Sequence, residues 1–299
     1  MKRLLLYSVC LLLVAATGCN NDDKDSGKEK MSDTTKLTAF TDPVASNGQK
    51  TIDQKTIASP QLVNTTKKVA YIYDDFMQAI TSWNTATGKT ATEIYMLYAA
   101  YTLKDMAHYL ALHRGVTEKI FMDSILGQPC LLMGYPDSAN PGKLFYAEFG
   151  TICPPPTSCE TFALIKNRMQ FFDKKEFVYP GFDPDEMIDV YNKSYNTEAS
   201  RPLTSMVRFN IDSIRNLYKA AGARKNESIY FFMGAYDNQD AQRYVKSHPG
   251  FNIAIGEIQD KTCLLFALFD PMSTGSDKYN YFDFGTICPP ENSCKSTFK

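Results

Sequence analysis

The sequence is poor in the residues that most often carry chemistry. It has three histidines and one tryptophan in 299 residues. It contains no glycine-rich phosphate loop, no Gly-x-Ser-x-Gly elbow and no His-Glu-x-x-His helix. His108 and His113 are five residues apart, a spacing that does not place two metal ligands on one helix face. The sequence therefore offers no catalytic residue, no metal site and no cofactor.

The chain has no large excess of positive or negative charge. It also has few long apolar runs. Lysine and arginine number 32 against 33 for aspartate and glutamate, and without the first 18 residues the balance is 30 against 33. A nucleic-acid partner would need a basic stripe, which this balance does not indicate. The one apolar run, from Leu4 to Thr17, is shorter than the roughly 20 residues of a membrane-spanning helix.

That apolar run has the form of a secretory leader. Lys2 and Arg3 precede it, and small residues and a cysteine end it as Ala16-Thr17-Gly18-Cys19. The ending resembles the lipobox of bacterial lipoproteins, in which the cysteine is acylated, although Ala16 stands at the usual leucine position. We predict a signal peptide over residues 1–18 and a lipid bilayer as partner through acylated Cys19. An ordinary cleaved leader with a stray cysteine is the alternative.

The chain behind Cys19 is polar. Asn20-Asn21-Asp22-Asp23 opens a stretch rich in Ser, Gly, Lys and Thr, which cannot bury enough apolar surface to fold. We expect a flexible tether over residues 19–45. Its acidic start resembles the signal that sends lipoproteins of Bacteroidota to the cell surface, but a merely solvated tether explains it equally well. The expected location is the outer membrane, with surface exposure as a hypothesis.

The body of the chain repeats itself. Residues 149–155, Phe-Gly-Thr-Ile-Cys-Pro-Pro, recur unchanged 135 positions later as residues 284–290. Such an identity at a fixed offset predicts a tandem duplication. The first copy covers residues 46–165, a connector follows over residues 166–200, and the second copy covers residues 201–299. One pseudo-symmetric body and two separate domains are both consistent with this pattern.

Each copy has the pattern helix, strand, helix and then three strands, judged from apolar periodicity and turn residues. The expected helices are residues 72–83, 103–113, 186–195, 211–218 and 240–247. The expected strands are residues 94–101, 120–125, 130–135 and 144–149, then residues 229–236, 253–258, 263–269 and 279–284. This order favours an α+β fold with mostly antiparallel sheets covered by helices on one face.

Residues 229–236, Ile-Tyr-Phe-Phe-Met-Gly-Ala-Tyr, and the closing Phe-Gly-Thr-Ile-Cys-Pro-Pro motif carry a resemblance. Together they resemble a domain of uncharacterised secreted proteins of Bacteroidota, whose strand of the type IRIYFGxY precedes a closing NxGxxCPPxC. The likeness covers residues 209–294 and, less closely, residues 71–159. The spacing of the final cysteine pair is longer here. The resemblance implies fold and location but no activity.

Eight cysteines divide by position. Cys10 leaves with the leader and Cys19 takes lipid, which leaves three in each copy. In an oxidising compartment we predict two structural disulfides, and a seven-residue ring of this kind stabilises by about 2.4 kcal/mol. The predicted pairs are Cys153 with Cys159 and Cys288 with Cys294. Their spacing fits neither a zinc site nor a Cys-x-x-Cys redox site.

Two further cysteines and two acidic clusters leave alternatives open. Cys130 and Cys263 lie in apolar strands, where a small buried residue is expected, although a bridge to another cysteine stays open. The clusters Asp74-Asp75 and Asp183–Glu186 provide either helix caps, with Asp185 near a helix start, or ligands and acids of a site.

The leading expectation is a non-catalytic, lipid-anchored binding or structural module, whose protein or glycan partner the sequence does not identify. The abundant aromatics, 18 Tyr and 19 Phe, either fill sheet cores or present binding surfaces. An envelope hydrolase acting on glycan or peptide is the alternative. A carboxylate pair in one deep pocket would favour the hydrolase, and a shallow aromatic face repeated in both copies would favour binding.

Overall fold

The computed structural model describes thirteen stretches of the chain. They are residues 39–40, 66–113, 115–136, 144–153, 182–195, 204–222, 227–236, 238–247, 253–259, 261–270, 272, 279–282 and 285–288. The chain divides into a unit of residues 1–33 and a unit of residues 34–299. All of the described residues belong to the second unit. The predicted leader, Cys19, Cys159 and Cys294 lie outside the described residues.

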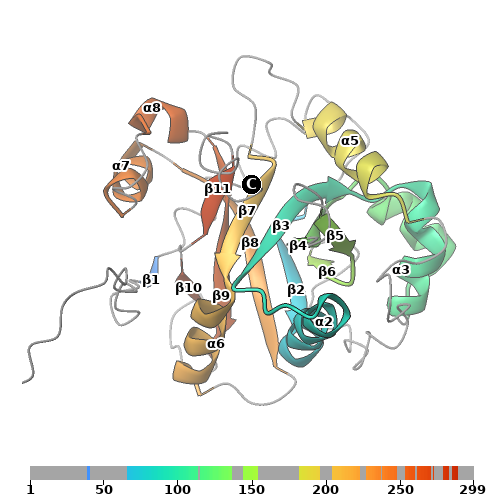
Figure 1. The fold of residues 1–299 in the computed structure, drawn as a ribbon. Helices are drawn as coiled ribbons and strands as arrows, with labels where there is room; N and C mark the ends of the chain where they lie inside the picture. Colours follow the sequence, from blue (N-terminus) through green and yellow to red (C-terminus); the bar gives the residue numbers. More distant parts are fainter. Residues whose placement is uncertain are drawn as a thin grey trace, which may run out of the picture. The chain divides into compact units, whose positions relative to one another are not determined.

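Helices and strands follow one another in a similar order in both sequence copies (Figure 1). In the first copy they are β2 (Lys68–Ile72), α2 (Tyr73–Thr87), β3 (Glu93–Ala100), η2 (Leu103–Asp105), α3 (Met106–Leu112), α4 (Glu118–Ile120), η3 (Phe121–Ile125), β4 (Pro129–Pro136), β5 (Leu144–Ala147) and β6 (Thr151–Cys153). In the second they are β7 (Met206–Asn210), α6 (Ile211–Ala220), β8 (Ser228–Ala235), α7 (Asn238–Ser247), α8 (Ile255–Ile258), β9 (Thr262–Phe269), β10 (Tyr279–Phe282) and β11 (Thr286–Cys288). Two elements lie outside both copies, β1 (Ala39–Phe40) and α5 (Pro184–Tyr195).

The described strands form two sheets, and every strand pair in them is antiparallel. One sheet has the order β1-β10-β9-β8-β2-β6, and the other has the order β11-β7-β3-β4-β5. The α+β class and the antiparallel sheets expected from the sequence are therefore confirmed. Residues 39–40, within the predicted tether, pair with β10 as a short edge strand.

The sequence copies exchange strands between the two sheets. β2 of the first copy lies between its own β6 and β8 of the second copy, with Val69 opposite Phe231. Reciprocally, β7 of the second copy lies between its own β11 and β3 of the first copy, with Val207 opposite Met96. Figure 1 shows the blue β2 beside the orange β8, and the yellow β7 beside the teal β3. Each sheet thus combines three strands of one copy with two of the other.

Aromatic side chains join the two sheets. Phe231 on β8 is fully buried, and its ring lies 5.8 Å from that of Tyr71 and 5.2 Å from that of Phe209. The Tyr71 hydroxyl donates to the carbonyl of Leu131 on β4 at 3.0 Å. In these described residues the aromatics fill the core, because a buried tyrosine adds apolar area and still satisfies its hydroxyl.

Helix boundaries follow local chemistry. Asn210 caps α6, because its side chain accepts a hydrogen bond from the Ser213 amide at 2.9 Å. Gly222 follows that helix with a φ of 65°, a left-handed conformation that glycine adopts without strain. For α5 the predicted helix cap within the Asp183–Glu186 cluster is confirmed: Asp183 accepts from the Glu186 amide at 3.1 Å, and Asp185 lies in the first turn.

Two predicted strands are helical. Residues 120–125 form the end of α4 and the π-helix η3, with Phe121 and Ile125 buried and Met122 exposed between them. Residues 253–258 contain α8, in which Ile258 is buried and Ile255 is exposed. Apolar residues three or four apart place one side of a helix against the core. In so short a segment that spacing resembles strand alternation.

Besides β1, four short strands were not expected from the sequence. β2 and β7 run directly into α2 and α6 without a turn residue that would separate strand from helix. β6 and β11 are the three-residue strands Thr-Ile-Cys of the repeated motif, which lie beyond the expected strands 144–149 and 279–284. These four are the strands that the copies exchange, so the exchange was invisible to local patterns.

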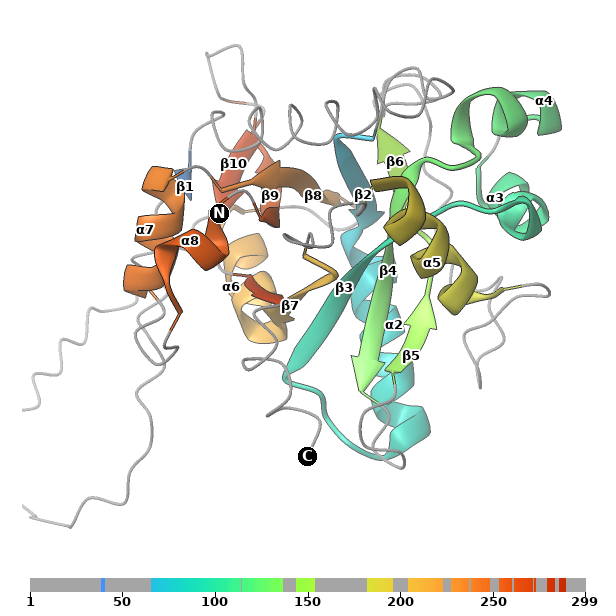
Figure 2. The ribbon, with the colours of Figure 1, turned by 90° about the horizontal axis from the view of Figure 1, so that it is seen from above.

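Helices of the two copies lie at opposite sides of the sheets. Figure 2 shows α3 and α4 at one side and α7 and α8 at the other. Between them, α2 and α6 meet where Tyr73 stacks on Tyr218, with ring centroids 3.5 Å apart. The described parts of residues 66–288 therefore pack as one body built from both copies.

Cleavage of the chain in the connector is expected to leave the two copies associated. A sequence-specific protease site is inserted after Asp173 and cut in the folded protein. The cut breaks the covalent link between a fragment that holds β2 to β6 and a fragment that holds β7 to β11. Because each sheet holds strands of both fragments, we expect co-elution in size-exclusion chromatography and two bands on a denaturing gel. The same gel under reducing conditions controls for a disulfide between the fragments, and separate elution would contradict the exchanged topology.

Candidate functional site

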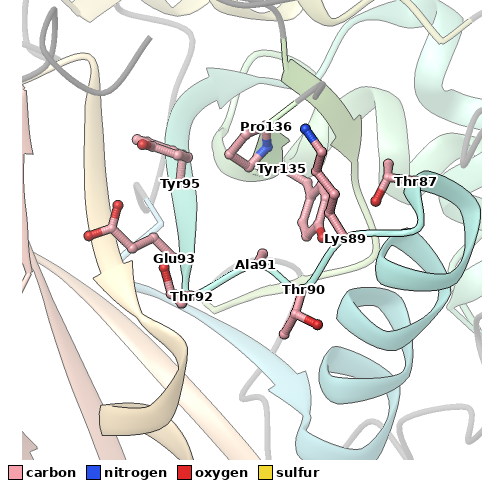
Figure 3. A pocket seen from close by; sticks show the side chains of 9 residues that line it. All are labelled: Thr87, Lys89, Thr90, Ala91, Thr92, Glu93, Tyr95, Tyr135 and Pro136. Atoms are coloured by element: carbon pink, nitrogen blue, oxygen red, sulfur yellow. The ribbon is translucent and has the colours of Figure 1, made fainter. Parts of the chain in front are cut away.

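A pocket of about 190 Å³ opens where α2 ends and β3 begins. Its wall consists of the loop after α2, the start of β3 and the end of β4 (Figure 3). Three threonines, one lysine, one glutamate and two tyrosines contribute to it. The lining residues are Thr87, Lys89, Thr90, Ala91, Thr92, Glu93, Tyr95, Tyr135 and Pro136.

The loop that forms the rim is held by hydrogen bonds. Gly88 ends α2 with a φ of 67°, which turns the chain sharply toward β3. Asn84 on α2 then accepts two hydrogen bonds, from the Ala91 amide at 2.9 Å and from the Tyr135 hydroxyl. The side chain of Asn84 thereby joins the loop to β4. This arrangement fixes the shape of the pocket before any ligand binds.

The floor of the pocket is aromatic. Tyr95 and Tyr135 are 1% and 2% exposed, and the Tyr135 ring packs 4.9 Å from that of Trp83. Burial raises the pKa of Tyr135 above its ordinary value. The hydroxyl therefore stays protonated at neutral pH and remains a donor to Asn84.

The two charged side chains of the pocket differ in their surroundings. Glu93 lies 3.6 Å from Arg208 on the neighbouring strand β7, and this ion pair is partly buried. Lys89 is exposed, and it has no ion pair among the described residues. Because Arg208 balances the charge of Glu93, Lys89 gives the pocket a net positive potential.

These groups can form hydrogen bonds and an ion pair with a polar ligand. Threonine hydroxyls both donate and accept hydrogen bonds, and an exposed ammonium attracts an anion. The nine lining residues include one carboxylate and no histidine, serine or cysteine. They therefore hold no carboxylate pair of the kind that glycoside hydrolysis uses.

The histidines that the sequence singled out lie away from this pocket and are buried. His113 ends α3, with Nδ1 at 2.8 Å from the Tyr109 carbonyl and Nε2 at 3.1 Å from the Thr151 hydroxyl. His108 Nε2 lies 3.1 Å from the backbone carbonyl of Glu148. Both rings thus fix α3 to the segment over residues 148–151. His248 lies outside the described residues.

A buried carboxylate, Glu148, lies beside these two histidines. Glu148 is 1% exposed and accepts hydrogen bonds from the Tyr101 hydroxyl at 2.7 Å and the Gly150 amide at 3.2 Å. Burial, followed by the charge of Glu148, raises the pKa of Tyr101 well above its ordinary value. Tyr101, Gly150 and Thr151 recur in the second copy as Tyr236, Gly285 and Thr286. The repeated residues in the first copy therefore hold the fold together.

The cysteines agree with a structural role where the structure describes them. Cys153 carries a disulfide, and its predicted pairing with Cys159 stays a prediction. The backbone of Cys288 lies in β11, and the pair with Cys294 is likewise untested. Cys130 and Cys263 are fully buried thiols. Burial raises the pKa of Cys130 well above its ordinary value, which disfavours a nucleophilic thiolate.

Within the described stretches, no three or more His, Cys, Asp or Glu side chains group as metal ligands would. None of the described helices has the length and apolarity needed to cross a bilayer. Comparison with protein-family models, with curated proteins and with solved structures finds no match for the chain.

The sequence did not indicate the pocket. Its loop, Thr-Gly-Lys-Thr-Ala-Thr-Glu at residues 87–93, reads only as a polar connection between a helix and a strand. The one signal is that three of its seven residues are threonine. Tyr135 and Arg208, which lie over 40 residues away in the sequence, reach the site only through the sheet.

Proposed function

We propose that the protein is a lipid-anchored envelope protein that binds a partner without transforming it, and that the pocket at the end of α2 is its binding site. The observation that carries this proposal is the composition of the pocket. Its walls offer hydroxyls, one ammonium and a carboxylate already paired with Arg208. Such groups recognise a polar ligand and lack the parts of a hydrolytic site.

The hydrolase alternative has less support in the described residues. A glycosidase needs two carboxylates across a cleft, one of them ionised. Glu93 is the single carboxylate among the residues that line the pocket. Glu148 is buried in the core, where it accepts hydrogen bonds from Tyr101 and Gly150. To separate the two functions, the purified full chain is incubated with envelope glycan and peptide fragments. Retention of intact fragments supports binding, and release of new reducing ends or amino termini favours the hydrolase.

Replacement of Cys19 by serine is expected to abolish acylation completely, because a hydroxyl lacks the thiolate that takes the lipid. Cells fed an alkyne-labelled fatty acid would label the wild-type protein and not the Cys19→Ser variant. Cys10→Ser is the matched control, since Cys10 lies in the leader and its loss should leave labelling unchanged. An unlabelled wild-type protein, or a mature N-terminus other than a modified Cys19 in mass spectrometry, would overturn the anchored part of the proposal.

A further inference from the structure

We infer that the pocket at the end of α2 accommodates one pyranose ring that carries a carboxylate, such as a hexuronic acid unit of a glycan. This inference rests on the proposed binding function and names the ligand class of the same site. It follows from the volume of the pocket, its hydroxyl lining, its aromatic floor and the charge of Lys89.

The pocket has room for a single sugar ring. Its volume is about 190 Å³, below the about 300–1,000 Å³ of pockets that bury a drug-sized ligand. The pocket lies at the surface, with Lys89, Thr90 and Thr92 exposed at its rim. A glycan chain can therefore extend from the bound ring into solvent.

The lining suits a ring that is polar at its edge and apolar on its face. Figure 3 shows the Thr87, Thr90 and Thr92 side chains around the opening and Tyr135 beside Pro136 in its wall. Hydroxyl groups of a sugar both donate and accept, as those of Thr90 and Thr92 can. The Thr87 hydroxyl already donates to the Trp83 carbonyl at 2.8 Å. The C–H face of the ring can contact Pro136, which is partly exposed, since an apolar surface favours burial of such groups.

The charge favours an acidic sugar. The Arg208 guanidinium already forms an ion pair with the Glu93 carboxylate at 3.6 Å. The charge of Glu93 therefore does not cancel that of Lys89. Lys89 stands at the rim, across the opening from Glu93 in Figure 3, where a carboxylate at the edge of the ring would meet it. A single flexible ammonium suits a carboxylate, whereas phosphate recognition commonly uses Arg forks or several backbone amides.

The residues that line the pocket are not repeated at the equivalent positions of the second copy. The 135-residue offset places Ser228 where the first copy has Glu93, and Lys225, Asn226 and Glu227 where it has Thr90, Ala91 and Thr92. The threonine hydroxyls are thus specific to the first copy. The expected stoichiometry is one uronic acid per chain.

Isothermal titration of the full mature chain with methyl galacturonoside and with methyl galactoside tests this inference. We expect one site, with the galacturonoside binding about 1.4-fold to 5-fold more tightly, because an exposed ion pair contributes about 0.2–1 kcal/mol. Lys89→Gln should remove the difference between the two sugars. Thr90→Val with Thr92→Val should weaken both, because sugar hydroxyls lose their partners.

Lys246→Gln is the matched control, since Lys246 is exposed on α7 outside the pocket. Unchanged preference in Lys246→Gln and lost preference in Lys89→Gln support the inference. Binding of neither sugar, or a preference for the galacturonoside that persists in Lys89→Gln, overturns it. The acylation of Cys19 and the retention of intact fragments are measured independently of these titrations. A failure of this inference can therefore be told apart from a failure of the proposed function.

Discussion

Replacement of Phe231 by alanine is expected to lower the free energy of unfolding by about 3–5 kcal/mol. Phe231 has no exposed surface, and its ring lies within 6 Å of those of Tyr71, Phe76, Phe209 and Phe266. Removing it leaves a cavity that four neighbouring elements cannot all fill. Urea denaturation followed by far-UV circular dichroism measures the change. Phe269→Ala, at a position that is 44% exposed, is the control and should shift stability by less than about 1 kcal/mol.

The same variant tests whether the sequence copies unfold together. Trp83, the one tryptophan of the chain, is buried in α2 of the first copy, while Phe231 belongs to the second. Because Phe231 contacts Tyr71 and Phe76 of the first copy, we expect the fluorescence of Trp83 to shift its midpoint together with the circular dichroism. A Trp83 transition that stays at its wild-type midpoint would mean that the copies fold independently.

Replacement of Gly150 by alanine is expected to destabilise the protein by about 1–3 kcal/mol through overpacking. An added Cβ at this position would overlap Cγ1 of Val69 and lie 2.9 Å from Cζ of Tyr71. Gly285, its counterpart in the second copy, is equally close to Val207 and Phe209, at 2.5 and 2.9 Å. The glycine of the repeated Phe-Gly-Thr-Ile-Cys motif is therefore needed because the exchanged strands β2 and β7 pass against it.

Two further variants make the test of Gly150 specific. Gly256→Ala in α8 is the matched control, since nothing lies within 4 Å of an added Cβ there. Val69→Ala combined with Gly150→Ala should recover part of the lost stability, because the smaller side chain makes room for the methyl group. Thermal unfolding of all four proteins measures these differences. Equal losses for Gly150→Ala and Gly256→Ala would show that the close contact does not matter.

The sequence by itself determined most of the longer elements of the described chain. Apolar periodicity predicted α2, β3, α3, β4, β5, α5, α6, β8, α7, β9 and β10. These predictions hold because a helix or strand depends on residues within a few positions of one another. The two wrong strands, at residues 120–125 and 253–258, are short segments in which helical and strand spacing resemble each other.

The tertiary structure alone decided which strand pairs with which. β2 and β7 are both short apolar strands, and their patterns do not say whether β3 or β8 is the neighbour. The pocket depends on the same decision, because Arg208 reaches Glu93 only when β7 lies beside β3. Pairing between strands that are over 100 residues apart is governed by packing of the whole core, a property that no local pattern contains.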